Sequence, residues 1–224
     1  MPNDKESDLL KSSHLSQWIN YEKDFSEKWY ESWSKDYLVK SLVQSSNQPS
    51  VLLCAQHATN HYQEGLPKKA DRGTGGLALT LGDRSSAGYI IKTSNEDALN
   101  GDPQSLKRML LLAKPDLLID IHGMREHKES DLDIGLGKNP NKMSLDAIAM
   151  LKEILADTEI RVTVNQVFKA SNPKTLTTWA QRNSMAAFQI EIGANIRPPE
   201  GRTENMDALI SGFLTFLKEM ERYR

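Results

Sequence analysis

The chain has 224 residues, of which 26% are charged, and its formal net charge is −2. A chain of this length forms one domain of ordinary size, and its near-neutral charge argues against nucleic acid as a partner. A single cysteine excludes an internal disulfide, and the lack of an apolar run of roughly 18 residues or of a signal-peptide core predicts a cytoplasmic protein without a membrane partner.

Aromatic residues recur at helical spacing between residues 15 and 42. This spacing would place most of them on one face of a helix. We expect one or two helices packed over the domain, and an aromatic lid near a ligand site is the alternative. The residues concerned are Trp18, Phe25, Trp29 and Trp33, followed by Leu38 and Leu42.

A polar stretch that contains Pro49, residues 45–50, predicts a linker after this segment. We therefore divide the chain into a helical N-terminal segment, residues 1–47, and an α/β unit, residues 48–224. The segment is expected to pack on the α/β unit.

Apolar strands and amphipathic helices alternate through the second unit. The expected strands cover residues 51–56, 87–92, 117–121, 132–136, 160–167 and 186–192, and the expected helices cover residues 74–81, 103–113, 144–155, 174–182 and 206–220. Asp102 and Pro103 are the expected N-cap and first residue of the second helix. Cys54 lies inside the first strand and is expected to fill the core. The alternation predicts a three-layer α/β/α fold with a mixed, largely parallel sheet.

Polar residues that could carry chemistry follow or interrupt these strands. His57 directly follows the first strand, and His122 closes the strand over residues 117–121. Ligands of α/β proteins bind beyond the carboxyl ends of the strands, and a neutral imidazole is a common zinc ligand. Each histidine alone is more typical of a structural hydrogen-bonding residue, but the two together indicate a metal site.

A catalytic zinc usually has three protein ligands, and a carboxylate from the stretch after His57 is expected to be the third. The residue three positions after His57 is Asn60, so the helical His-x-x-Glu pattern is absent. Asp71 lies in an expected tight turn before a glycine-rich helix start, whereas Glu64 lies in a looser segment. We prefer Asp71 and keep Glu64 as the alternative. Asp71 taken alone would also suit a turn or a helix cap.

Two acidic residues lie inside expected strands. Asp120 shares a strand face with His122 because side chains alternate, so it either orients that ligand or accepts backbone hydrogen bonds. Glu191 is flanked by apolar residues. A buried carboxyl has a raised pKa and suits a general base that activates water and then protonates a leaving amine. The alternative for Glu191 is a buried ion pair with Arg182 or Arg197.

An arginine near Glu191 would bind a substrate carboxylate with two hydrogen bonds. Arg197 follows the Glu191 strand at short range, and Arg125 and Arg182 are alternatives. Each of these arginines taken alone is more typical of a surface charge.

Two other site classes are disfavoured. The glycine-rich stretch at residues 73–76 lacks the spacing of nucleotide-binding loops. The chain also has no Gly-x-Ser-x-Gly elbow, which argues against a serine hydrolase of the α/β type. A metal site therefore remains the leading interpretation.

These motifs, in their order and spacing, resemble the N-formylglutamate amidohydrolase superfamily, which is related to the zinc carboxypeptidases and aspartoacylases. The resemblance covers about residues 51–197. It rests on His57-Ala58-Thr59-Asn60-His61, Lys69-Ala70-Asp71-Arg72-Gly73-Thr74-Gly75, Asp120-Ile121-His122-Gly123 and Gln189-Ile190-Glu191-Ile192, with Arg197 after them. The tryptophan-rich N-terminal segment has no counterpart that we can place.

The resemblance implies a phosphorylase/hydrolase-like fold, one zinc or other divalent ion per chain, and hydrolysis of an amide bond. By position, His57 and His122 match the metal histidines of the family, and Asp71 matches the acidic residue of its first loop. Glu191 matches the catalytic glutamate, and Arg197 is the expected partner of the substrate carboxylate.

The expected function is therefore that of a zinc-dependent amidohydrolase that acts on N-formylglutamate, another N-acyl amino acid or a short peptide, with Glu191 as the general base. Asn60 and Arg182 are the other expected substrate contacts. The alternative is a catalytically silent member of the same fold that binds a ligand or a partner protein. A third hypothesis is a metal-free hydrolase or phosphatase in which His57 or His122 acts as acid or base.

Overall fold

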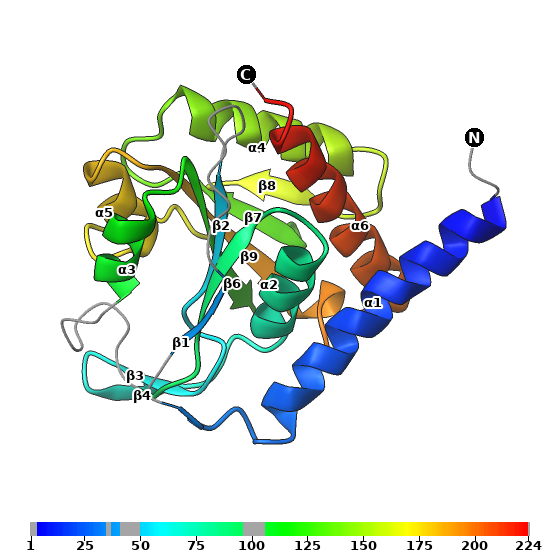
Figure 1. Cartoon of the computed structure of the whole chain (residues 1–224), viewed down its shortest axis with the longest axis horizontal. Helices are drawn as coiled ribbons and strands as arrows, with labels where there is room; N and C mark the ends of the chain where they lie inside the picture. Colours follow the sequence, from blue (N-terminus) through cyan, green and yellow to red (C-terminus); the bar gives the residue numbers. More distant parts are fainter. Residues whose placement is uncertain (1–3, 35–36, 41–49, 96–105, 224) are drawn as a thin grey trace.

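The structure, a computed structural model, describes residues 4–34, 37–40, 50–95 and 106–223. Figure 1 shows how its elements are arranged. The strands are β1 Tyr37–Lys40, β2 Val51–Ala55, β3 His61–Gln63, β4 Leu66–Lys68, β5 Gly88–Lys92, β6 Leu117–Met124, β7 Leu132–Gly135, β8 Val162–Val164 and β9 Ala186–Gly193. The helices are α1 Asp4–Ser26, α2 Thr74–Asp83, α3 Leu106–Ala113, α4 Lys142–Leu155, α5 Leu176–Arg182, the 3₁₀ turn η1 Ala194–Ile196 and α6 Thr203–Met220.

The main sheet of the described residues has seven strands in the order β1-β5-β2-β6-β9-β7-β8. β5, β2, β6 and β9 run parallel to one another, whereas β1 and β7 are antiparallel to β5 and β9. Parallel strands need helical cover on both faces, and Figure 1 shows helices on either side of the sheet. The predicted three-layer α/β/α fold with a mixed, largely parallel sheet is confirmed.

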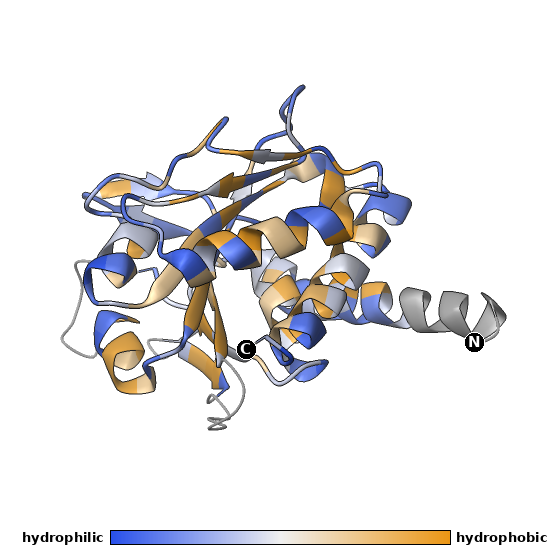
Figure 2. Cartoon of the chain, turned by 90° about the horizontal axis from the view of Figure 1, so that it is seen from above, coloured by the Kyte–Doolittle hydropathy of each residue, from blue (hydrophilic) through white to orange (hydrophobic). Residues whose placement is uncertain are grey.

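Side-chain alternation divides the central strands between two cores. One face of the sheet packs against α1, α2, α4 and α6, and the other packs against α3 and α5. On β6, Ile119 and Ile121 belong to the larger core and Leu118 belongs to the smaller. Asp120 and His122 follow Leu118 in steps of two, so they lie on the α3 and α5 side of the sheet. Figure 2 shows hydrophobic residues along the strands and both hydrophobic and hydrophilic residues on the helices.

The N-terminal segment is helical only in part. α1 lies along α2 and α6 (Figure 1) and ends at Ser26. Beyond it Trp29 has a positive φ of 56° and is 82% exposed, whereas Trp18 and Phe25 are buried. β1 then joins the main sheet beside β5. The predicted helices over residues 15–42 are therefore wrong for the described residues after Ser26, because residues 27–34 form turns and irregular structure and Tyr37–Lys40 pairs with β5.

The predicted strand over residues 160–167 is also shorter than expected. β8 ends before Asn165, which has a positive φ of 56°. Asp133, a buried residue of β7, accepts hydrogen bonds from the backbone N–H groups of residues 166–168. These donors therefore bond to a carboxylate instead of a neighbouring strand, and the chain turns.

Some expectations lie outside the described residues. They are Leu42, the boundary between residues 47 and 48, most of the linker at residues 45–50, and the N-cap of α3 at Asp102 with Pro103 after it. None of the helices in the described part of the chain is long and apolar enough to cross a bilayer.

Candidate functional site

A pocket of about 430 Å³ lies at the carboxyl ends of β2, β6 and β9. The register between β6 and β9 pairs Asp120 with Gln189 and His122 with Glu191. Paired residues of adjacent strands point to the same face of the sheet. All four side chains line the pocket, where the α3 and α5 side of the sheet changes from apolar to polar.

His57, Asp71 and His122 bring three ligand atoms together in this pocket. Asp71 Oδ2 lies 3.4 Å from His57 Nδ1 and 3.2 Å from His122 Nδ1. Zinc bonds of about 2.0–2.1 Å in tetrahedral geometry place two ligand atoms about 3.3 Å apart. Two of the three spacings fit a metal ion, and all three ligand atoms lie within 4.8 Å of one another. These residues are the single cluster of this kind within the described ranges.

Asp71 is held in a closed turn. Its N–H donates to His57 O at 2.8 Å, and the N–H and hydroxyl of Thr74 donate to its carbonyl at 3.2 and 2.6 Å. Glu64, the alternative ligand, is exposed and forms an ion pair with Lys174 at the rim of the pocket. The structure thus brings Asp71, and not Glu64, to the two histidines.

Asp120 orients His122. Its Oδ2 lies 3.1 Å from His122 Nε2, and Gln56 Nε2 donates to both of its carboxylate oxygens at 3.0 and 3.1 Å. A carboxylate on one ring nitrogen leaves the other nitrogen directed at the metal position. Burial disfavours a charged ring, but Asp120 and Asp71 outweigh it and raise the pKa of His122. The surroundings of this ring therefore favour positive charge.

The same balance lowers the pKa of Asp71. Burial alone would raise this pKa, but hydrogen bonds from His122 and His57 outweigh burial and keep the carboxylate charged. A charged carboxylate is the form that a metal ion binds.

Glu191 lies beside this cluster and is 6% exposed. Burial raises its pKa to about 7, and Gln189 Nε2 donates to its Oε1 at 2.7 Å. A carboxyl with a pKa near neutrality can both accept and return a proton. Glu191 is therefore a candidate for proton transfer in this pocket.

Arg197 differs from its expected role. It is 7% exposed, and its guanidinium donates to the backbone carbonyls of Ile192, Met124 and Arg72. These donors join the ends of β6 and β9 to the turn after Asp71, and Arg197 is not among the residues that line the pocket.

The other two expected substrate contacts also lie away from the pocket. Arg182 is exposed at the last residue of α5, whereas Leu176 at the first residue of that helix lines the pocket. Asn60 joins backbone segments, because its Oδ1 accepts from Ala70 N at 2.9 Å and its Nδ2 donates to Trp29 O at 3.3 Å. Asn60 therefore has a structural role in this arrangement, and neither residue lines the pocket.

Three polar residues at or beside the site were given no role from the sequence. Gln56 and Gln189 lie two positions beyond a core residue on the pocket face of their strands, so strand alternation would have found them. His61 stacks on His57 with ring centroids 4.2 Å apart. Burial lowers the pKa of His61 to about 4, so it supports the ligand as a neutral ring.

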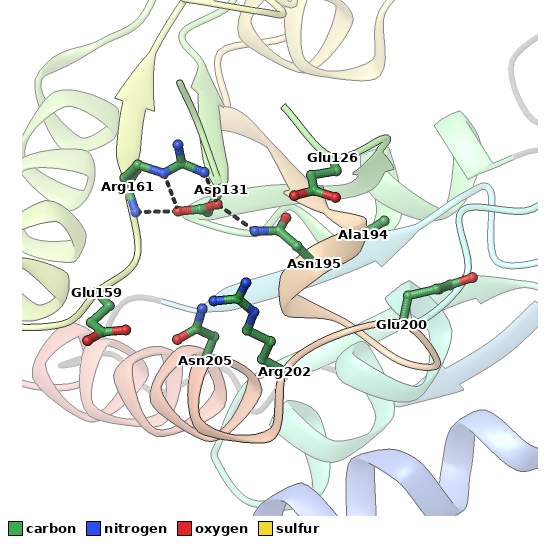
Figure 3. A pocket seen from close by; sticks show the side chains of 9 residues that line it. All are labelled: Glu126, Asp131, Glu159, Arg161, Ala194, Asn195, Glu200, Arg202 and Asn205. Carbon is green, nitrogen blue, oxygen red and sulfur yellow. Dashed lines mark hydrogen bonds and ion pairs between the residues drawn. The ribbon is translucent and has the colours of Figure 1, made fainter. Parts of the chain in front are cut away.

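A second pocket, of about 470 Å³, lies beside η1 and the start of α6 (Figure 3). Asp131, one of the four acidic residues that line it, accepts hydrogen bonds from Arg161 Nη2 and Asn195 Nδ2, both at 2.6 Å. None of the expected site residues lines this pocket. Because its buried carboxylate is already paired, we place the chemistry in the first pocket.

No family model and no curated protein matches the chain. Solved structures do match in fold. N-formylglutamate amidohydrolase from Ralstonia eutropha has a TM-score of 0.54 and 11% identity, covering 84% of this chain and 99% of that chain. Bacteriophage poly-gamma-glutamate hydrolase has a TM-score of 0.54 and 14% identity, covering 86% and 93%.

A metallo-carboxypeptidase from Burkholderia cenocepacia has a TM-score of 0.50 and 14% identity, covering 82% of this chain and 60% of that chain. At these identities the likeness concerns the fold. The predicted resemblance to the N-formylglutamate amidohydrolase superfamily and its carboxypeptidase relatives is confirmed at that level.

Proposed function

We propose that this protein is a metal-dependent hydrolase that cleaves the amide bond of a small N-acyl amino acid or short peptide. The proposal rests above all on the convergence of His57, Asp71 and His122 in a pocket that also holds Glu191. The fold likeness to amidohydrolase and peptidase structures agrees with it.

The metal would be held by His57, Asp71 and His122. Zinc suits this combination of two imidazoles and a carboxylate, although another divalent ion could occupy the same ligands. When bound, it would act as a Lewis acid toward the substrate carbonyl.

Glu191 would move the proton. Its buried carboxylate accepts a proton from the attacking water and returns it to the nitrogen of the leaving amine. Gln189 fixes the direction of the carboxyl through its hydrogen bond to Oε1. The register between β6 and β9 keeps Glu191 next to the His122 ligand.

The rim of the pocket offers a cation for a carboxylate-bearing substrate. Lys174 lies at the rim in an ion pair with Glu64, and its side chain is 74% exposed. Exposed ion pairs contribute little stability, so a substrate carboxylate can take the place of Glu64. Lys174 therefore replaces Arg197 as our candidate for this contact.

The first test is metal analysis of protein purified without chelators, wild type beside His122→Ala. We expect about one zinc per chain in the wild type and its loss in the variant. Absence of metal from both proteins after zinc is supplied would contradict the proposal.

A screen for amine release follows, with N-formyl and N-acyl amino acids and short peptides as substrates. Turnover by the metal-loaded protein is expected. Loaded protein that stays inert across the panel would instead favour the catalytically silent, ligand-binding alternative.

A further inference from the structure

The glycine-rich turn after Asp71 is bound on both sides of Gly73 by the N-terminal helix. Trp18 Nε1 donates to Gly73 O at 2.8 Å, and the Glu22 carboxylate accepts from Gly73 N at 2.6 Å and from Gly76 N at 3.0 Å. Both side chains are buried, and they lie one helical turn apart on α1. One residue separates Gly73 from the ligand Asp71.

Glu22 also caps the first turn of α2. The first N–H groups of a helix have no partners within it, and Gly73 provides no side-chain cap for α2. The carboxylate of Glu22 satisfies two donors at the positive end of the helix, a favourable place for an anion. The cap therefore comes from a distant part of the sequence.

The glycines of this stretch allow the close approach of α1. A Cβ at Gly75 would lie 2.5 Å from the Phe25 ring, and a Cβ at Gly76 would lie 2.9 Å from Glu22 N. Such contacts are too short for real side chains. The glycine pattern at residues 73–76, which fits no nucleotide loop, thus has a structural reason in the packing of α1 against α2.

The stretch after α1 holds the other ligand-bearing loop. Asn60 N donates to Tyr30 O at 2.7 Å, and Asn60 Nδ2 donates to Glu31 Oε1 at 3.0 Å. Asn60 lies three residues after His57, and the Asp71 N–H donates to His57 O. The N-terminal segment is therefore bonded to both loops that carry metal ligands in the proposed function.

We propose that Trp18 and Glu22 are positioning residues of the metal site, which fix the Asp71 turn at the distance from His57 and His122 that a metal requires. This inference rests on the proposed function. It gives the N-terminal helix a role in the site rather than that of a cover or a partner interface. Loss of groups that orient metal ligands typically weakens metal binding by about 10–100-fold.

The test compares Trp18→Phe and Glu22→Gln with Tyr21→Phe as the matched control. Trp18→Phe keeps the aromatic ring but removes the donor to Gly73, and Glu22→Gln keeps the shape but replaces one acceptor oxygen. Tyr21→Phe removes a hydrogen bond between α1 and Asp83 at the far end of α2, so it loosens the same helix pair without touching the turn.

Cobalt or zinc affinity is measured by competition with a chelator, and the amide hydrogen exchange of residues 71–76 is measured in metal-free protein. We expect about 10-fold or greater loss of affinity and faster exchange in the two turn variants, with wild-type values for Tyr21→Phe. Circular dichroism confirms that each variant is folded.

The outcomes separate the two proposals. Equal affinity and exchange in all four proteins would overturn the positioning role and leave the proposed function in place. An equal loss of affinity in Tyr21→Phe would also overturn it, because general loosening of α1 would then explain the effect. A wild type that binds no metal would refute the proposed function and this inference with it.

Discussion

Glu191 is the residue at which the proposed chemistry can be separated from metal binding. It lies in the pocket but is not one of the three ligand residues. Glu191→Gln keeps the shape of the side chain and removes the base, so turnover is expected to fall by about 10²–10⁴-fold. Zinc content, measured on the same samples, is expected to stay at the wild-type level.

The matched control for this experiment is Glu126→Gln, which changes an exposed glutamate that lines the second pocket. It is expected to keep both turnover and zinc. Full activity of Glu191→Gln would assign the proton transfer to another group, and loss of its zinc would show that the residue helps to hold the metal.

How far the sequence predicts single residues depends on whether a role is local. Asp71 could be preferred to Glu64 because a tight turn is visible in neighbouring residues, and the structure brings Asp71 to the histidines. The role of Arg197 could not be predicted from its neighbours in the sequence. Its donors bond to carbonyls of residues 72, 124 and 192, and proximity of this kind arises only from the fold.

Among the elements, the contact between α1 and α2 is sensitive to a small change. An alanine in a helix is ordinarily more stable than a glycine by about 1 kcal/mol. At Gly75 the added Cβ would meet the Phe25 ring at 2.5 Å, so we expect Gly75→Ala to lower the free energy of unfolding by about 1–3 kcal/mol. Denaturant unfolding measures the change.

A double-mutant cycle with Phe25→Ala identifies the cause. Gly75→Ala should cost less in the Phe25→Ala background, because the ring that it meets is gone. The same cost in both backgrounds would refute the contact as the cause, and a stabilised single variant would refute the close approach itself.

The sequence also predicted some elements better than others. The order of the main-sheet strands and of the helices through residues 51–220 followed from alternating apolar patterns, since local periodicity reflects burial. The exposed β3-β4 hairpin was not predicted, because its strands are short and mostly polar. The prediction of helix for residues 15–42 was correct only up to Ser26, because aromatic spacing alone does not show where a helix ends. The second part of this segment pairs with β5, a partner about fifty residues later in the chain, and such pairing is not encoded locally.

For the molecule as a whole, the N-terminal helix introduces a buried acid whose charge affects stability. Glu22 is 4% exposed, and burial raises its pKa from the usual 4.5 to about 7. The folded protein therefore binds a proton more tightly at Glu22 than the unfolded chain does. Stability must fall with rising pH wherever the folded state holds more protons.

The difference in the free energy of unfolding between wild type and Glu22→Gln isolates this effect, because other groups that titrate are common to both proteins. Below pH 4.5 the carboxyl is protonated in both states. Between pH 4.5 and 7 only the folded state keeps the proton, so the stability of the wild type relative to Glu22→Gln should decrease by up to about 3 kcal/mol. Above pH 7 the difference should level off.

Chemical denaturation of metal-free wild type and Glu22→Gln at several pH values measures this difference in the free energy of unfolding. A difference that stays constant or rises from pH 4.5 to 8 would mean that Glu22 is stabilised as a carboxylate by its Gly73 and Gly76 donors more strongly than burial opposes it.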